Sequence, residues 1–219
     1  MNKNKISKII CVVLCSVAVF SSCAKLSPND LIMPEHQIDG LGDNEQSVKG
    51  DRFLFPSGIT EKIQSYASSG KTADTTLGSG GNVEVLLSLN NTTSNAILVE
   101  LPAAVVFQCS SIIYKNGLLI KKIRFSVPAN AVYNVAVKLY CCNLARDVSR
   151  GAAEYIPIVS NTKEVSQFCD YFKNKAINYE DKHKDYNSNQ TKIQLIVWDF
   201  AQYGYMPMGK SMETINGLP

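Results

Sequence analysis

Val83-Glu84-Val85-Leu86-Leu87-Ser88-Leu89 is the stretch of sequence that decides the fold. Every second residue from Val83 to Leu89 is apolar, and in a β-strand alternate side chains point to the same face. Leu86, on the opposite face, is apolar as well. The stretch therefore predicts a strand that begins the folded core.

Further short apolar segments follow, separated by turn residues. We expect strands over residues 96–101, 103–109, 123–127 and 132–140. Between them, Asn116-Gly117 is the strongest short hairpin signal, and it predicts that residues 112–114 and 118–120 pair with each other. Six or seven short strands at spacings of about 8–12 residues are typical of an immunoglobulin-like antiparallel β-sandwich. We assign this sandwich to residues 83–143.

The pattern changes after residue 143, where we expect two or three helices packed on the sandwich. Asn161 and Glu164 fit a capping box at the start of a helix over residues 161–175. Residues 178–190 are polar and are predicted to form a loop. Residues 191–203 fit either a helical face or an alternating strand, and their length and the following Gly204 favour a helix. A last short helix is expected over residues 210–216, so the predicted fold class is α+β.

The residues before the sandwich divide into three parts. A polar segment with prolines and glycines, residues 23–50, has the composition of a flexible tether. Within residues 51–82 we expect a short docking strand at 53–55, then one or two helical turns at 59–66, then a polar linker. The helical turns are predicted from Ile59, Ile63 and Tyr66, which recur at helical spacing.

The first 22 residues have the pattern of an export signal. Three lysines among residues 1–8 precede an apolar run over residues 9–20. That run is shorter than the roughly 20 apolar residues that a membrane-spanning helix needs. The sequence therefore predicts a signal peptide.

The end of this signal carries two small residues, Ser21 and Ser22, directly before Cys23. This pattern resembles the lipobox of bacterial lipoproteins. The resemblance implies cleavage before Cys23, attachment of lipid to that cysteine, and a membrane as partner. Ala24, in place of an aspartate, implies delivery to the outer membrane in Gram-negative bacteria. The alternative is an ordinary signal peptide that is cut nearby.

The net charge depends on this cleavage. The full chain carries 22 basic and 19 acidic residues. The signal removes three lysines and no acidic residue, so the mature chain is formally neutral. A nucleic-acid partner is not expected, because such proteins carry a basic surface.

The mature folded part has four cysteines: Cys109, Cys141, Cys142 and Cys169. An exported protein meets oxidising conditions, and four cysteines can pair in three ways. Adjacent residues of a strand point to opposite faces, so Cys141 and Cys142 are not expected to bond to each other. The sequence allows one disulfide without choosing the pair. The alternative is that all four are small buried apolar residues.

Two short motifs lie about 50 residues apart: Tyr140-Cys141-Cys142-Asn143 and Gln194-Leu195-Ile196-Val197-Trp198. They resemble the thioester domains of bacterial surface adhesins. The resemblance implies an internal thioester between Cys141 or Cys142 and Gln194, which is a stored electrophile able to capture an amine on a host surface. The alternative is a cysteine at a strand end and a core tryptophan on a covering helix.

The remaining motifs are less specific. Asp74-Thr75-Thr76 resembles an O-glycosylation motif of some Gram-negative envelope proteins, with Thr75 as the acceptor. His183 lies between Asp181 and Asp185, and the interleaved lysines favour a solvated charged loop over a metal site. We assign no catalytic residue, metal or cofactor.

The sequence therefore favours a lipid-anchored binding or structural module at the cell envelope, with an unknown protein or glycan ligand. The alternatives are a thioester-type adhesin domain and an envelope enzyme.

Overall fold

Strand β9 (Ala131–Cys141) organises the fold. The computed structural model describes residues 37–150 and 153–219. Along most of its length β9 pairs antiparallel with β4 (Val83–Asn91), with Val83 opposite Leu139. Its last residues pair with β7 (Gly117–Leu119). The stretch that opens β4 thus forms the predicted strand.

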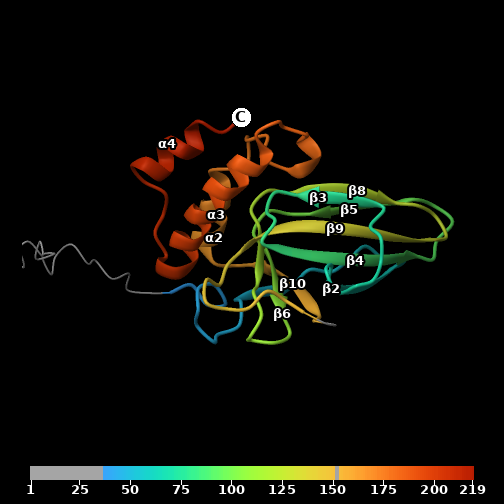
Figure 1. Cartoon of the computed structure of the whole chain (residues 1–219). Coiled ribbons are helices and arrows are strands. Elements are labelled where there is room, and N and C mark those ends of the chain that lie inside the picture. Colours follow the sequence, from blue (N-terminus) through green and yellow to red (C-terminus); the bar gives the residue numbers. More distant parts are fainter. Residues whose placement is uncertain (1–36, 151–152) are drawn as a thin grey trace, which may run out of the picture. The chain divides into compact units, whose positions relative to one another are not determined.

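The described strands form two sheets (Figure 1). The larger sheet has the order β1-β10-β6-β7-β9-β4-β2, and β3 pairs with β9 in parallel while the other pairs are antiparallel. Its remaining strands are β1 (Gly50–Arg52), β2 (Ile59–Ser65), β3 (Thr75–Gly78), β6 (Val105–Cys109) and β10 (Tyr155–Ser160). The smaller sheet pairs β5 (Ile97–Leu101) with β8 (Ile123–Val127).

Among the described residues, the helices lie in the C-terminal third of the chain, and together with the sheets they confirm the α+β class. They are α2 (Lys163–Asp170), the short 3-10 helix η2 (Tyr179–Asp181), α3 (Tyr186–Tyr203) and α4 (Lys210–Asn216). The ambiguous segment 191–203 is helical, and Gly204 ends it with a positive φ of 69°. The predicted capping box is wrong, because Thr162 is the N-cap of α2 and makes no side-chain cap bond. Over residues 37–150 and 153–219, no helix is long and apolar enough to cross a membrane.

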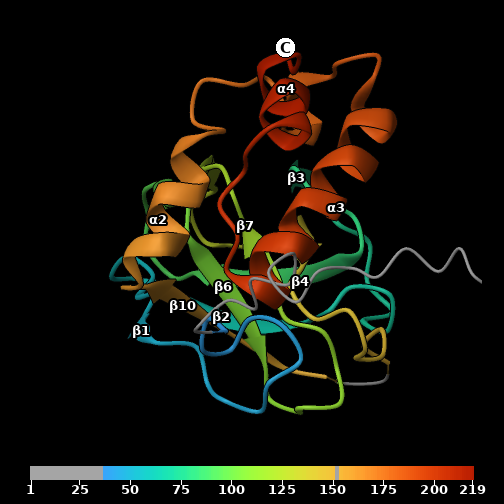
Figure 2. The same ribbon diagram turned by 90° about the vertical axis from the view of Figure 1, so that its left-hand side faces the viewer.

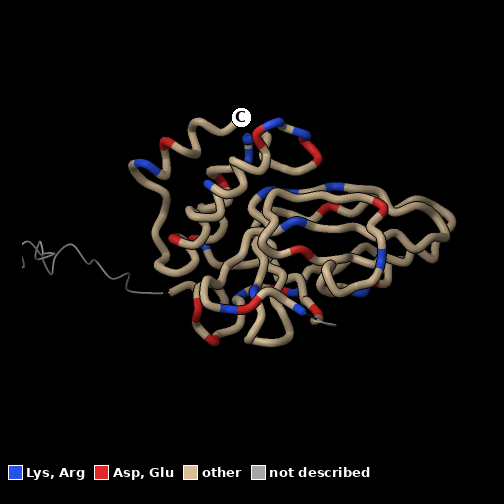
Figure 3. Tube along the Cα trace, in the orientation of Figure 1, with Lys and Arg blue, Asp and Glu red and all other residues tan. Residues whose placement is uncertain are grey.

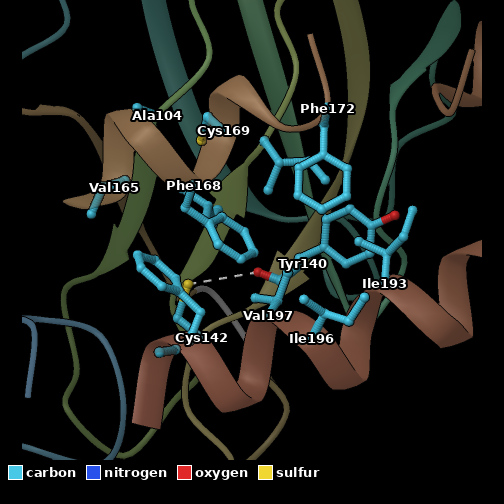
Figure 4. Packing of buried hydrophobic residues seen from close by; sticks show 14 of the residues in the cluster. Ala104, Tyr140, Cys142, Val165, Phe168, Cys169, Phe172, Ile193, Ile196 and Val197 are labelled. Carbon is cyan, nitrogen blue, oxygen red and sulfur yellow. Dashed lines mark hydrogen bonds between the residues drawn. The ribbon is translucent and has the colours of Figure 1, made fainter. Parts of the chain in front are cut away.

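Two apolar cores lie on opposite sides of the β9 end. Tyr140 and Cys142 face the helices (Figure 4). There Phe168 stacks on Phe200 with ring centroids 4.1 Å apart. In the view of Figure 2, β6 and β7 are seen between α2 and α3. We call this cluster the helical core. Leu139 and Cys141 face the other cluster, in which β5 and β8 meet the larger sheet; we call it the sheet core. The side chains alternate as a strand requires.

Residues 37–48 are part of the fold, so the tether prediction is wrong for them. Ile38, Leu41 and Val48 lie in the helical core, and the backbone of Gly42 donates a 2.9 Å hydrogen bond to the carbonyl of Cys142. The sequence concealed this packing because the segment is a loop, and its apolar residues dock singly without a repeating period.

Residues 59–65 form strand β2, so the predicted helical turns are also wrong. Ile59 pairs with Asn91 and Ser65 pairs with Val85 of β4. A spacing of four residues marks one face of a helix, but it also marks one face of a strand, because four is a multiple of two. The predicted linker likewise contains a strand, β3, that pairs with β9.

The predicted hairpin at Asn116-Gly117 is wrong as well. Residues 112–114 form no strand; β7 pairs with β6, and a loop joins the two. Asn116 is buried, and its side chain accepts a 2.9 Å hydrogen bond from the Cys109 N–H and donates one to the Gly40 carbonyl. The asparagine is therefore a polar support inside the fold.

Candidate functional site

Cys141 and Gln194 are in direct contact, although they are 53 residues apart in the chain. The Cys141 N–H donates to Gln194 Oε1 at 2.9 Å, and Gln194 Nε2 donates to the Cys141 carbonyl at 2.9 Å. The structure thus brings together two of the three residues that the sequence motifs nominated. Cys142 points into the helical core, away from this pair.

The end of β9 explains why the glutamine fits there. β4 pairs with β9 only as far as Val83 opposite Leu139, so Cys141 has no strand neighbour on that side. The Cys142 N–H points the other way, toward the carbonyl of Asn116. The amide of Gln194 takes the place of the missing strand, because a buried peptide group needs hydrogen-bond partners. Trp198 lies one turn further along α3, on the same face as Gln194.

The pair is sealed from solvent. Cys141 is 0% exposed and Gln194 is 3% exposed. Burial raises the pKa of the Cys141 thiol, and the Trp198 indole and the Lys115 ammonium act against that rise. The Trp198 Nε1 is itself buried and forms no hydrogen bond of normal geometry. The sulfur of Cys141 donates to the Asn143 carbonyl at 3.1 Å.

The two hydrogen bonds join the Gln194 side-chain amide to the backbone N–H and carbonyl of Cys141. Attack on an amide places negative charge on its oxygen, and here that oxygen already accepts the Cys141 N–H. A fixed backbone donor at the position where charge develops is the usual form of oxyanion stabilisation.

Lys115 approaches the same site and was not nominated from the sequence. Its Nζ donates to the carbonyls of Asn143 and Leu144, both at 3.3 Å. The Asn143 carbonyl is thus shared by Lys115 and the Cys141 thiol. No sequence pattern indicates this contact, because the Asn-Gly signal predicts that Lys115 lies in the turn of a hairpin, and that hairpin does not form.

An open depression of about 410 Å³ lies beside the loop that starts at Asn143. Two apolar side chains that line it, Ile112 and Ile113, are more than half exposed. The loops are held in place, since the Asp147 N–H donates to the Ile113 carbonyl at 2.9 Å. Figure 3 shows basic and acidic residues interspersed along the described chain. The residues that line the depression are Asp43, Asn44, Glu45, Ile112, Ile113, Ala145, Arg146 and Asp147.

The four cysteines are free thiols, which agrees with the second of the two alternatives that the sequence left open. Cys109 and Cys141 lie in the sheet core, whereas Cys142 and Cys169 lie in the helical core. Each packs as a small apolar side chain. Burial raises the pKa of Cys142 well above its usual range and that of Cys169 to about 12.

The other nominated residues do not join this site. Cys23 lies outside the described residues. Thr75 is half-buried at the start of β3, where it pairs with Val135. His183 is 4.0 Å from Asp185, while the Asp181 carboxylate caps η2. Over residues 37–150 and 153–219, no cluster of three or more His, Cys, Asp or Glu side chains is arranged to hold a metal ion.

Comparison with known proteins adds nothing to this geometry. No family model matches the chain, and no curated protein or solved structure matches it. The function is therefore argued from the residues themselves.

Proposed function

We propose that this protein is a lipid-anchored envelope protein that attaches covalently to an amine-bearing partner through an internal thioester between Cys141 and Gln194. The folded part would be an immunoglobulin-like sandwich covered by helices, and Cys23 would carry the lipid. The observation that carries the proposal is the pair of 2.9 Å hydrogen bonds between Cys141 and Gln194.

The contact supports the resemblance because Cys141 and Gln194, which belong to the two separate motifs, exchange hydrogen bonds in the fold. Of the two cysteines, only Cys141 exchanges hydrogen bonds with Gln194, whereas Cys142 lies in the helical core. The proposed thioester therefore involves Cys141 and not Cys142.

The proposed reaction has two steps. In the first, the Cys141 sulfur attacks Gln194 Cδ, the Cδ–Nε2 bond breaks, and ammonia leaves with the thiol proton. In the second, an amine of the partner attacks the thioester carbonyl, the C–S bond breaks, and the thiolate takes a proton. The product is an amide on the Gln194 side chain, with the Cys141 thiol restored.

Burial gives the thioester a long lifetime. Water reaches neither Cys141 nor Gln194 in the closed fold, since their exposures are 0% and 3%. For the same reason, a partner amine reaches the carbonyl only when the loop that begins at Asn143 moves. That loop borders the open depression, which would be the side of approach.

Intact mass tests the proposal, because the same hydrogen bonds can hold α3 against β9 without any covalent bond. A thioester lowers the mass by one ammonia, about 17 Da, relative to the sequence. We expect this deficit in the wild type and not in Cys141→Ser, and methylamine should add its own mass while releasing one thiol. An undiminished mass, with every thiol open to alkylation after unfolding, would overturn the thioester.

The anchor has its own test. Cys23→Ala should give a folded protein that no longer fractionates with membranes. If this variant stays membrane-bound after its leader is removed, the lipid anchor is wrong, and the thioester is unaffected.

A second candidate function is non-covalent binding of a protein at the open depression. The observation that favours it is the pair of exposed apolar side chains, Ile112 and Ile113, on a loop that is hydrogen-bonded to Asp147. Exposed apolar groups of this kind often mark interaction sites. A binding screen against matrix proteins and glycans, repeated with Ile113→Asp, should lose its protein ligand in the variant. A ligand that binds both forms equally would place the binding surface elsewhere.

A further inference from the structure

We propose that Lys115 is an internal acceptor for the thioester, so that an unused thioester ends as an amide bond between Lys115 and Gln194. This inference rests on the proposed thioester. The bond would join the β6–β7 loop to α3 and would discharge the electrophile permanently.

The Lys115 side chain lies close to the Cys141 sulfur. Lys115 Nζ lies 3.3 Å from the Asn143 carbonyl oxygen, and the Cys141 sulfur lies 3.1 Å from the same oxygen. Because both atoms lie near the same oxygen, the distance between Lys115 Nζ and the Cys141 sulfur is at most the sum of these two distances. The acyl carbon of a thioester is bonded directly to that sulfur.

Hydrogen bonds fix the backbone at Lys115 and at the residue that follows it. The Lys115 N–H donates to the Asp147 carbonyl at 3.0 Å, and the next residue, Asn116, donates its N–H to Asn143 Oδ1 at 2.6 Å. The backbone is thus fixed, and only the side chain has to turn. A nucleophile held beside its target reacts at a high effective concentration.

Lys115 can reach the proposed thioester more readily than an external amine or another lysine can. Because Cys141 and Gln194 are buried, an external amine must wait for an opening motion, whereas Lys115 is half-buried and already bonded to the Asn143 carbonyl. Lys192 is only two residues from Gln194, but at that spacing it projects from another face of α3, where it is exposed. Other lysines are engaged elsewhere, for example Lys175 with the carbonyls of Asn216 and Leu218.

The step balances without any oxidant or reductant. The Lys115 ammonium first gives one proton to solvent. The neutral amine then attacks the thioester carbonyl, the Cδ–Sγ bond breaks as the Cδ–Nζ bond forms, and the second proton passes to the thiolate. The product keeps the mass deficit of one ammonia, but it resists methylamine and leaves Cys141 as a free thiol.

The test follows the full-length protein over time after purification. Intact mass, methylamine reactivity and peptide maps are measured for the wild type and for Lys115→Arg. The arginine keeps the positive charge, but its guanidinium group does not attack the thioester. Lys192→Arg is the matched control, and thermal melting shows that each variant folds. In the wild type and in Lys192→Arg, we expect the methylamine-sensitive fraction to fall while the mass deficit stays and a peptide joining Lys115 to Gln194 appears. In Lys115→Arg the whole deficit should stay methylamine-sensitive.

The outcomes separate the two proposals. A methylamine-sensitive deficit that persists equally in the wild type and Lys115→Arg, with no joined peptide, would overturn the role of Lys115 and leave the thioester intact. The absence of any mass deficit at all times would overturn the thioester and this inference together.

Discussion

Cys141 and Cys142 are neighbours in the chain and equally buried, yet they lie in different surroundings. Cys142 points into the helical core among aromatic rings, and its sulfur has only a long contact of 3.8 Å to the Tyr140 carbonyl (Figure 4). Cys141 lies beside an amide, an indole and an ammonium group. One step along a strand separates a packing residue from a candidate nucleophile. Because both residues are cysteines, the difference in their surroundings comes from the face of the strand on which each side chain lies.

The largest expected change in the free energy of unfolding concerns the helical core around Cys142, where apolar side chains pack together. Phe168→Ala should lower the free energy of unfolding by about 3–5 kcal/mol, because it removes a fully buried ring and leaves a cavity. Urea unfolding measures the change. Leu195→Ala on α3 is the control, since Leu195 is 56% exposed and should cost less than about 0.5 kcal/mol. Similar losses in both variants would mean that the helical core is not the main support of the helices.

The next effect concerns the Cys141 side, where hydrogen bonds are at work. Gln194→Leu should cost about 2–4 kcal/mol, because it leaves both the N–H and the carbonyl of Cys141 buried without partners. Gln202 provides a matched control two turns along the same helix. Its buried Oε1 has no hydrogen-bond partner, so Gln202→Leu should cost less than about 0.5 kcal/mol. Denaturation midpoints that rank the two variants in the opposite order would contradict the pairing.

A smaller effect of opposite sign is expected at Tyr140, next to both cysteines. Its hydroxyl is buried without a hydrogen-bond partner, and burial raises its pKa well above the usual range. Tyr140→Phe should therefore stabilise the protein by up to about 1 kcal/mol. Tyr186→Phe, which loses a 2.6 Å hydrogen bond to the Gly80 carbonyl, should instead destabilise it by about 1 kcal/mol. Thermal melting of both variants checks the difference in sign.

The smallest effect concerns pH and lies away from both cysteines. Burial raises the pKa of Glu180, although its carboxylate accepts the Gly78 N–H and the Asn178 side-chain amide. A raised pKa means that the ionised form is disfavoured in the fold. Stability should therefore rise slightly as the pH falls from neutral through the folded pKa toward the ordinary value of 4.5. Glu180→Gln should flatten this part of the melting profile, and an unchanged profile would show that Glu180 does not contribute.

Sequence reasoning succeeded where the pattern had one interpretation. The alternation in β4 and β9 predicted their strands, and the same alternation predicted that Cys141 and Cys142 lie on opposite faces. It failed where a spacing fitted two periods, as in β2, and where single apolar residues dock from a loop, as with Leu41. The Cys141–Gln194 contact was foreseen only through the motif resemblance. The position of Lys115 depends on a loop whose shape is set by tertiary contacts, and no local pattern predicts it.

The docking of residues 38–48 shortens the segment that would join the folded part to the proposed lipid anchor. If Cys23 carries the lipid, roughly 14 residue steps separate it from Gln37, and at about 3.3–3.6 Å each they span at most about 50 Å. A tether that ran to residue 50 would span roughly twice that distance. The Gly42 N–H donates to the Cys142 carbonyl, so the docked segment 38–48 lies next to the Cys141 site. The proposed capture would then operate close to the bilayer, and a partner that cannot come within that radius would be out of its range.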